Sequence, residues 1–356
     1  METVGRAESD KGETMMDKDH LARTAKALVA EGRGIFAADE SGGTIAKRFA
    51  AIGVGSTEET RRDYRELLFR SKDALRQYIS GVILFDETIR QSASDGAPLV
   101  KLIEAAGAIP GIKVDLGARP LPNFPGETIT EGLDGLHDRL MNYYGLGARF
   151  AKWRAVIDIN QDTGVPTEYA VEANARALAR YAAHCQDANL APIVEPEVLM
   201  DGDHDIERCA EVTEFVLNRV FAALYEARVF LEGMALKPNM VVAGKKCARR
   251  APPEQVAEAT LRVLRRTVPI AVPGVAFLSG GQSDVEATAN LDAINRIRGP
   301  WALTFSYGRA LQTSALKCWA GKPENVKAAQ AAFTHRARMN ALASQGRWTE
   351  KQEEAA

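Results

Sequence analysis

The sequence predicts an α/β protein folded as a single (β/α)8 barrel, the TIM-barrel architecture, with an extra N-terminal helix and a flexible C-terminal tail. Eight short apolar or β-rich segments recur at intervals of roughly 27 to 47 residues, which is the room that a strand, a loop and a helix need. The stretches between them carry helical periodicity, and strands that alternate with helices form a parallel sheet with covered faces. Eight such units favour a closed barrel over an open doubly wound sheet. The first segment is not followed by the Gly-x-Gly-x-x-Gly motif of dinucleotide-binding sheets, which weakens that alternative further.

The predicted strands are short runs that begin with small or apolar residues. They read GIFAAD from Gly34, GVILFDE from Gly81, GIKVD from Gly111, FAKWRAV from Phe150, APIVEPE from Ala191, VFLEGMALK from Val229, GVAFLSGG from Gly274 and WALTFSYG from Trp301. Each is short enough for a barrel strand.

The intervening helices are predicted from apolar residues three and four positions apart. Two such faces consist of Ile45, Phe49 and Ile52, and of Val256, Ala259 and Val263. A further apolar face precedes the first strand, and Gly32 is placed to end that helix. Its members are Leu21, Ala25, Leu28 and Val29. Because no Pro/Ser-rich linker divides the chain, we predict one barrel domain over residues 18–343, between a flexible segment at 1–17 and a flexible tail at 344–356.

Composition narrows the functional classes. The 356 residues carry a formal net charge of -2, which argues against a dedicated nucleic-acid binder or a protein held electrostatically on membranes. No apolar run approaches the roughly 18 residues of a membrane span, and the N-terminus lacks the apolar region of a secretory signal. The four cysteines are scattered, as in reduced cytoplasmic proteins, and the five histidines lack metal-ligand spacing. We therefore expect neither a metal nor another cofactor.

Each predicted strand ends at side chains able to do chemistry. They are Asp39, Asp86, Lys113 with Asp115, Lys152 with Arg154, Glu195 with Glu197, Lys237, Ser279, and Ser306 with Arg309. In a barrel these strand ends meet on one face, where active sites of this fold lie. Alone, Lys237 could simply lie along apolar surface with its charge in water. The ring of polar strand ends instead favours a buried amine that can act as a nucleophile.

Lys152 and Lys237 form a candidate pair of interacting amines. If the fold brings them to about 4 Å, an effective dielectric near 20 gives a repulsion of roughly 4 kcal/mol, enough to lower one lysine pKa from about 10.4 toward neutrality. Such an amine attacks a carbonyl and forms an imine, an electron sink for making or cleaving a carbon–carbon bond. A salt bridge from Lys152 to a carboxylate is the alternative, and both can hold together.

Three carboxylates could move the protons that imine chemistry requires. Asp39, Glu195 and Glu197 stand at different strand ends, where their neighbours can tune their pKa values apart. The alternative is that the VEPE segment merely neutralises Lys152 and Arg154, and for Glu197 this is an equally good interpretation.

Two segments are candidates for anion binding. Gly280, Gly281 and Gly308 let backbone amides approach a phosphate, and Arg309 adds a planar cationic fork. They belong to FLSGGQS and FSYGRA at the ends of the last two strands, where barrels often bind phosphate. The segment 40–44, ESGGT, opens the first helix after the first strand and could hold a second phosphate beside Lys113. Simple N-capping by Thr44 is the alternative there.

Taken in order, these motifs resemble class I fructose-1,6-bisphosphate aldolase from about Leu21 to about Trp348. The segments that carry the resemblance are GIFAADES, GVILFDET, GIKVD, AKWR, PIVEPE, LKPNM, FLSGGQS and WALTFSYGRALQ. The resemblance implies a (β/α)8 barrel, usually a homotetramer, that cleaves fructose 1,6-bisphosphate reversibly in glycolysis and gluconeogenesis without a metal. It also implies possible cytoskeletal partners.

The resemblance further implies a role for each matching residue. Lys237 would form the Schiff base, Glu195 would be the principal acid and base, and Asp39 with Lys152 would complete the catalytic set. The implied bisphosphate-binding residues are Arg48, Ser279, Gly280, Gly281, Ser306, Gly308 and Arg309, with Lys113, Arg154 and Ser41 at the other end of the site. Thr44 stands where many members have serine.

Two alternatives stay open from the residues alone. A related Schiff-base enzyme, such as a transaldolase-like or deoxyribose-phosphate aldolase-like protein, would share the lysine but have less need for two anion sites. A non-catalytic sugar-phosphate-binding or scaffolding protein would not need the complete catalytic set. One departure from the family is that many animal and plant members end in an active-site tyrosine, whereas the last tyrosine here is Tyr307.

Overall fold

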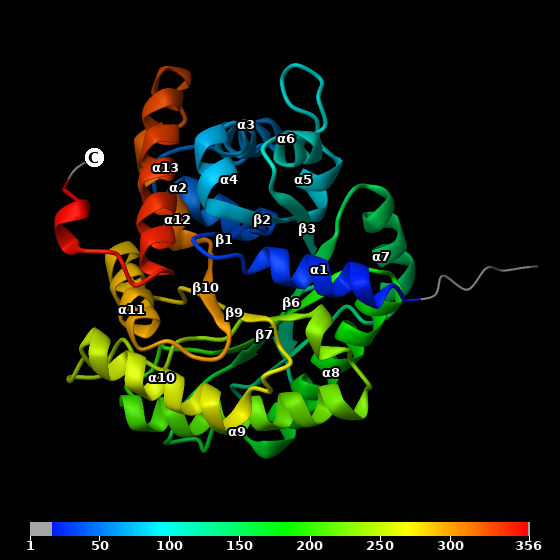
Figure 1. Ribbon diagram of the computed structural model, residues 1–356, viewed down its shortest axis with the longest axis vertical. Coiled ribbons are helices and arrows are strands. Elements are labelled where there is room, and N and C mark those ends of the chain that lie inside the picture. The colour runs from blue at the N-terminus through cyan, green and yellow to red at the C-terminus, as the bar shows by residue number, and fades with distance from the viewer. Residues whose placement is uncertain (1–15, 355–356) are drawn as a thin grey trace, which may run out of the picture.

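The computed structural model describes residues 16–354 and contains a closed barrel of eight parallel strands surrounded by helices (Figure 1). Around the barrel the strands follow the order β1-β10-β9-β8-β7-β6-β3-β2. They are β1 (Gly34–Ala38), β2 (Ile79–Leu84), β3 (Ile109–Lys113), β6 (Phe150–Ile157), β7 (Ala191–Val198), β8 (Ala235–Leu236), β9 (Gly274–Phe277) and β10 (Ala302–Tyr307). A small antiparallel hairpin, β4 (Ala118–Pro120) with β5 (Thr128–Thr130), lies outside this order. The predicted (β/α)8 architecture is confirmed.

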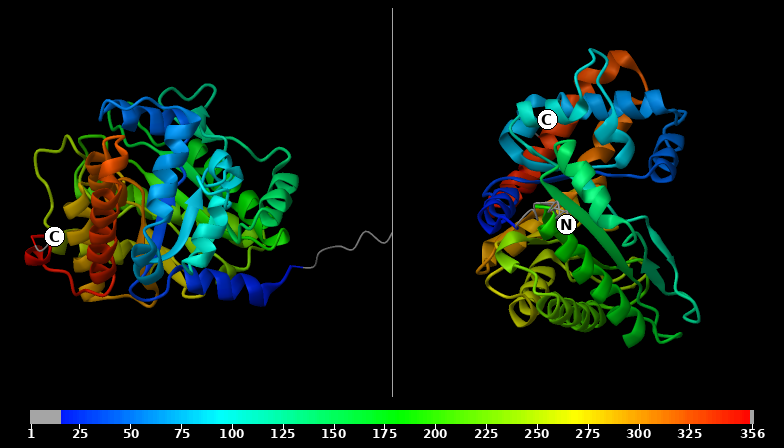
Figure 2. Two further views of the ribbon diagram at one scale, coloured as in Figure 1. Left: turned by 90° about the horizontal axis from the view of Figure 1, so that it is seen from above. Right: turned by 90° about the vertical axis from the view of Figure 1, so that its right-hand side faces the viewer.

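The helices form a layer around the barrel, and the two perpendicular views in Figure 2 show α1 lying across one end of it. In chain order they are α1 (Lys18–Leu28), α2 (Gly42–Ala50), α3 (Glu58–Phe69), α4 (Lys72–Tyr78), α5 (Asp86–Arg90), α6 (Leu99–Ala105), α7 (Leu136–Gly145), α8 (Glu168–Asp187), α9 (Ile206–Glu226), α10 (Pro253–Thr267), α11 (Asp284–Ile297), α12 (Arg309–Trp319) and α13 (Val326–Ala343). Three short 3-10 turns are η1 (Leu231–Gly233), η2 (Pro323–Asn325) and η3 (Glu350–Gln352).

The sixth predicted strand is much shorter than its apolar run. Most of the segment from Val229 lies outside the sheet, because η1 interrupts it and only β8 pairs with its neighbours. The cause is close packing against α1: a Cβ added to Gly233 would lie 2.9 Å from the Cβ of Leu21. Phe230 of the same turn lies equally close, at 2.8 Å, so the turn fits tightly against α1 before the backbone enters the barrel.

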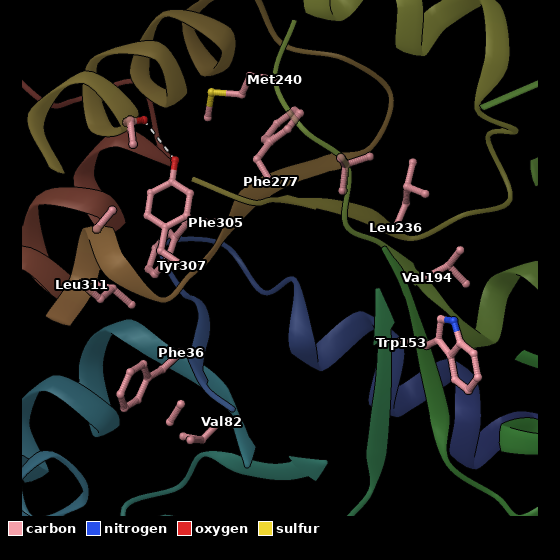
Figure 3. Close-up of a cluster of buried hydrophobic side chains, with 14 of the residues drawn as sticks. Phe36, Val82, Trp153, Val194, Leu236, Met240, Phe277, Phe305, Tyr307 and Leu311 are labelled. Atoms are coloured by element: carbon pink, nitrogen blue, oxygen red, sulfur yellow. Dashed lines mark hydrogen bonds between the residues drawn. The ribbon is translucent and has the colours of Figure 1, made fainter. Parts of the chain in front are cut away.

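One apolar core fills the space between the barrel and its helices. In Figure 3, Phe36, Trp153, Phe277 and other strand side chains project from the barrel toward the helix layer. All three are fully buried. Tyr307 shares this layer, and its hydroxyl donates a hydrogen bond to the carbonyl of Ala287 in α11 at 3.0 Å. This layer binds the helices to the sheet and lets the barrel interior carry polar groups.

A second apolar cluster closes the N-terminal end of the barrel interior. Leu21 and Leu28 of α1 belong to the same buried cluster as Ile35, Phe150 and Ile193 from the strands. Successive side chains of a strand face opposite ways, so positions two apart face the same way. The interior positions therefore continue as Lys152 and Arg154 on β6, and as Glu195 and Glu197 on β7. The interior is apolar at the end that α1 covers and charged at the other end.

The two predicted flexible segments have different outcomes. Residues 1–15 of the predicted N-terminal segment lie outside the described residues. In the predicted tail, Trp348 and Glu353 are held against the body of the protein, while residues 349–351 are exposed. The backbone N–H of Trp348 donates to Asp292 Oδ1 at 2.8 Å, and its indole N–H donates to Glu353 Oε1 at 3.0 Å. Glu353 also pairs with the buried Arg336. This part of the chain is thus packed, because a charged anchor adds to the single apolar anchor that the sequence offers.

Replacing Gly34 with alanine tests how tightly the strands and the outer core are packed. A Cβ at Gly34 would lie 2.6 Å from the fully buried ring of Phe305. We expect Gly34→Ala to destabilise the protein by about 1–3 kcal/mol, as overpacking of a dense core does. The measurement is the thermal unfolding midpoint. Gly145→Ala is the matched control, since its added Cβ meets nothing within 4 Å; equal midpoints for the two variants would contradict this packing.

Candidate active site

A cavity of about 600 Å³ opens where the C-terminal ends of the barrel strands meet. All five predicted catalytic residues line it: Asp39, Lys152, Glu195, Glu197 and Lys237. It is also lined by the predicted binding residues Thr44, Arg48, Arg154, Ser279, Gly280, Ser306, Gly308 and Arg309. The fold thus brings together side chains from six barrel strands or the loops that follow them.

Glu195 lies at the centre of a buried chain of charged groups. Its Oε1 lies 3.2 Å from Lys237 Nζ, and its Oε2 lies 2.9 Å from Lys152 Nζ. Lys152 Nζ also donates to Asp39 Oδ2 at 2.9 Å. The side chains of Lys152, Glu195 and Lys237 are no more than 5% exposed. Both interpretations of Lys152 hold together: it forms salt bridges, and it lies in the same cluster as Lys237.

The strand register explains why these groups meet. β6 and β7 pair in parallel with Lys152 beside Ile193, and Glu195 is two residues further along, on the same face of β7. Lys237 is the first residue after β8, and its backbone N–H donates to the carbonyl of Val194 at 2.8 Å. That hydrogen bond continues the β7–β8 ladder by one step and places the lysine beside the Glu195 carboxylate.

The environment separates the protonation behaviour of these groups. Burial lowers the pKa of Lys237; Glu195 opposes this, and the charge of Lys152 lowers the pKa further. For Lys152 burial acts in the same direction, but Asp39 and Glu195 outweigh it and hold the pKa of that ammonium above its usual range. For Asp39, Lys152 and Lys237 outweigh burial and hold the pKa of the carboxyl well below its usual range. The site therefore combines an ammonium that holds its proton, Lys152, with a carboxylate that stays ionised, Asp39. The third group, Lys237, loses its proton more easily than an ordinary lysine does.

The rim of the cavity carries cationic and backbone groups suited to an anion. Arg309 donates a hydrogen bond to the carbonyl of Gly280, whose φ of +55° favours glycine. Burial and the nearby charge of Arg48 lower the pKa of Arg309, so an anion bound near both guanidiniums would favour their charged forms. Ser306, 1% exposed, has no hydrogen-bond partner for its hydroxyl among the described residues. Its position in the cavity wall suits a ligand oxygen.

Glu197 is paired with Arg154, as the alternative interpretation of the VEPE segment proposed. The Arg154 Nε donates to Glu197 Oε2. Although burial acts against it, Glu197 raises the pKa of Arg154 above its usual range. Glu197 therefore neutralises an arginine at the cavity wall, and no contact joins it directly to Lys237 among the interactions of residues 16–354.

Comparison with known proteins gives the same picture over nearly the whole length. Residues 20–356 match the family model of class-I fructose-bisphosphate aldolase.

The chain belongs to the class-I fructose-bisphosphate aldolase family.

The most similar aldolases include bacterial, animal and parasite proteins. The "Probable fructose-bisphosphate aldolase class 1" of Xanthomonas campestris is 56% identical over 335 residues, covering 94% of this chain and 99% of its own. A fructose-bisphosphate aldolase of Echinococcus multilocularis is 54% identical over 330 residues, covering 92% and 90%. The Plasmodium falciparum aldolase, solved in complex with TRAP and a small-molecule inhibitor, superposes with a TM-score of 0.92 at 52% identity, covering 93% of this chain and 95% of that one. The resemblance drawn from the motifs is confirmed.

Three predicted binding residues of this aldolase lie outside the cavity lining. Lys113 lines a neighbouring cavity of about 620 Å³, and its ammonium pairs with Asp115 at 2.7 Å. Gly281 is covered by the side chain of Lys245, and its N–H donates to the thioether of Met200 at 3.3 Å.

The third such residue, Ser41, is the N-cap of α2, and its hydroxyl lies 3.1 Å from that of Thr44. The N-capping alternative for Thr44 is therefore wrong, because the helix begins earlier, at Gly42. Ser41 itself makes no side-chain capping hydrogen bond, so its hydroxyl stays at the edge of the site beside Thr44.

Sequence reasoning missed Lys47, which lines the cavity. It stands next to Arg48 in α2 and three residues after Thr44, so helical spacing could have suggested it. Two adjacent cations on a helix usually face solvent, however, and the sequence alone gave no reason to place this one at a site.

Replacing Lys152 tests how the charges of the site control Lys237. In Lys152→Met the repelling ammonium is lost, and Glu195 and Asp39 attract the Lys237 proton more strongly. We expect the pKa of Lys237 to rise, so that imine formation requires higher pH than in the wild type. The measurement is the pH dependence of single-turnover borohydride trapping of dihydroxyacetone phosphate. An unchanged or acid-shifted profile would show that Lys152 does not act on Lys237.

Proposed function

We propose that this chain cleaves fructose 1,6-bisphosphate reversibly to dihydroxyacetone phosphate and glyceraldehyde 3-phosphate through a Schiff base on Lys237. The observation that carries the proposal is the position of Lys237: buried in the cavity, with a lowered pKa, and in contact with a carboxylate that can deliver and remove protons. Membership of the family supports the same substrate, and we infer from it a role in glycolysis and gluconeogenesis.

The first half of the mechanism forms the electron sink. The neutral amine of Lys237 attacks the ketone carbon of the substrate and gives a carbinolamine. Loss of the hydroxyl as water needs a proton, and Glu195, 3.2 Å from Lys237 Nζ, is placed to supply it. The product is an iminium ion on Lys237.

The second half breaks the carbon–carbon bond. A carboxylate of the Asp39–Lys152–Glu195 chain takes the proton from the hydroxyl next to the breaking bond. The electrons of that bond flow into the iminium, which becomes an enamine, and glyceraldehyde 3-phosphate leaves. Protonation of the enamine carbon and hydrolysis by water release dihydroxyacetone phosphate and restore Lys237. Lys152 keeps its ammonium throughout and stabilises the negative charge that develops on oxygen.

The rim residues would hold the two phosphates. Ser279, Gly280, Ser306, Gly308 and Arg309 form one group at the ends of β9 and β10. Arg48 on α2 belongs with this group, since a Cβ added to Gly308 would lie 3.9 Å from its Nη2. Lys47 and Thr44 of the same helix, with Ser41 at its start, form the second group. A substrate with a phosphate at each end uses both groups, which distinguishes this proposal from a monophosphate-specific Schiff-base enzyme.

Assembly and location rest on the family resemblance. The homotetramer, the cytoplasmic location and any cytoskeletal partner stay predictions. Within residues 16–354, no helix combines the length and apolar character that a membrane crossing requires.

Chemical trapping tests the nucleophile. Borohydride reduction in the presence of dihydroxyacetone phosphate should attach the substrate to Lys237, as peptide mapping would show. Lys237→Met should abolish both the adduct and turnover, while its circular dichroism and thermal midpoint show whether it folds. An adduct on Lys152 or Lys113 would overturn the assignment.

Replacing Arg309 tests the phosphate group at β9 and β10. Arg309→Ala removes a charge-assisted contact, and we expect bisphosphate binding to weaken by about 1.5–3 kcal/mol. Adduct formation at saturating substrate should be affected less than affinity. Arg265→Ala on α10 is the control, because this guanidinium donates to the Arg298 carbonyl and does not line the cavity. If both variants bind the substrate equally well, the phosphate lies elsewhere.

A further inference from the structure

A buried carboxylate behind the phosphate rim is shared by two guanidiniums. Glu40 follows Asp39 in the chain and is 8% exposed. Its Oε1 pairs with Arg48 Nη1, and its Oε2 lies 2.7 Å from Arg65 Nη1. Gln312 Nε2 also donates to Glu40 Oε1, at 2.6 Å.

The members of this cluster come from four different parts of the fold. Glu40 lies in the loop after β1, Arg48 in α2, Arg65 in α3 and Gln312 in α12. Gln312 Nε2 also donates to the carbonyl of Ala37 at 2.9 Å, which ties the cluster to the end of β1. Among these side chains, Arg48 lines the cavity, with 21% of its side chain exposed against 3% for Arg65.

The charges in the cluster do not balance. One carboxylate faces two guanidiniums, so the three side chains together have a surplus of one positive charge. Burial alone would raise the pKa of Glu40, but Arg65 and Arg48 hold it below its usual value, so the carboxylate remains ionised. Burying an unmatched charge costs stability, so the surplus has to lie on Arg48, the guanidinium that is partly exposed.

Of the two guanidiniums, Arg48 is the one that a ligand in the cavity can contact. Arg65 is enclosed by the protein, whereas Arg48 faces the cavity and lies close enough to Arg309 to influence its titration. A guanidinium paired one-to-one with a carboxylate presents little net charge to a third group. Arg48 escapes this neutralisation because Arg65 shares its partner.

We propose that Arg65 is a positioning residue for bisphosphate binding: it holds Glu40 from behind, so that Arg48 is fixed in place yet keeps its charge for a substrate phosphate. This inference rests on the proposed function, because it gives the charge a phosphate to bind. Arg65 touches no substrate and acts through Glu40 and Arg48.

Two variants separate charge from structure. In Arg65→Gln, Glu40 neutralises Arg48 alone, and we expect KM for fructose 1,6-bisphosphate to rise about tenfold, the scale of one charge-assisted contact, with a smaller change in kcat. In the double variant Glu40→Gln/Arg65→Gln, the surplus of one positive charge returns on Arg48. We expect its KM to return to within about threefold of wild type.

The double variant is decisive even if the single variant does not fold. If Arg65 merely supports the structure, removing it together with Glu40, the charged partner of Arg48, leaves KM about tenfold or more above the wild-type value, and the inference is overturned. Arg65→Lys keeps the charge and should also stay near the wild-type KM. Arg62→Gln is the control on the same helix, because its guanidinium pairs with Asp63 at the surface and should leave KM unchanged.

The wild-type protein distinguishes this inference from the proposed function. Failure of the wild type to cleave the bisphosphate, together with the lack of a borohydride adduct, would refute the proposed function itself. Cleavage by the wild type with an unchanged KM in Arg65→Gln would refute only the role of Arg65.

Discussion

The contact of one carboxylate, Glu195, with two lysine ammonium groups is the interaction on which the site depends. It exists because β7 lies between β6 and β8, so that a single side chain reaches both neighbours. The same contact creates a difficulty, since Glu195 favours the charged form of Lys237 that cannot attack a carbonyl. Burial must therefore be the stronger influence, and burial depends on the whole barrel. The apolar cluster beneath the site, which includes residues of α1, and the outer helix layer both maintain this burial. They therefore contribute to the reactivity of Lys237.

Much of the fold was predictable because a barrel repeats one unit eight times. The apolar runs and the polar groups at their ends identified both the architecture and the side of the barrel that carries the site. The prediction was wrong for the segment from Val229, where apolar residues suggested a long strand and contact with α1 imposes a turn. It also missed the anchoring of Glu353 by Arg336, since a pairing between a helix and a distant tail leaves no trace in local periodicity.

The electrostatic part of the site could be predicted only in outline. Strand ends revealed Lys152, Glu195 and Lys237, because charged residues are unusual after apolar runs. Lys47 and Arg65 on helices, and Glu40 in the loop after β1, gave no such signal, as charged residues usually face water. The burial of Glu40 and Arg65 follows from how α2 and α3 pack beside the end of β1, which is a property of the assembled structure, whereas Lys47 is exposed. Lys113 is the opposite case, because its place at a strand end predicted a position in the site. Its ammonium instead pairs with Asp115, and it lines a different cavity.

The position of α1 also has a consequence for how the protein is made. This helix leaves the ribosome early, yet its apolar face is covered by Phe150, Ile193 and the turn at Gly233, which are synthesised much later. Ile35 and Ile83 of the early strands belong to the same cluster, but until the later segments are made its native cover is incomplete. Contacts so distant in sequence form slowly, and exposed apolar faces invite aggregation in the meantime. Helix α1 is thus synthesised before any of the barrel strands, yet its packing is completed only after β7 and the turn at Gly233 have been made.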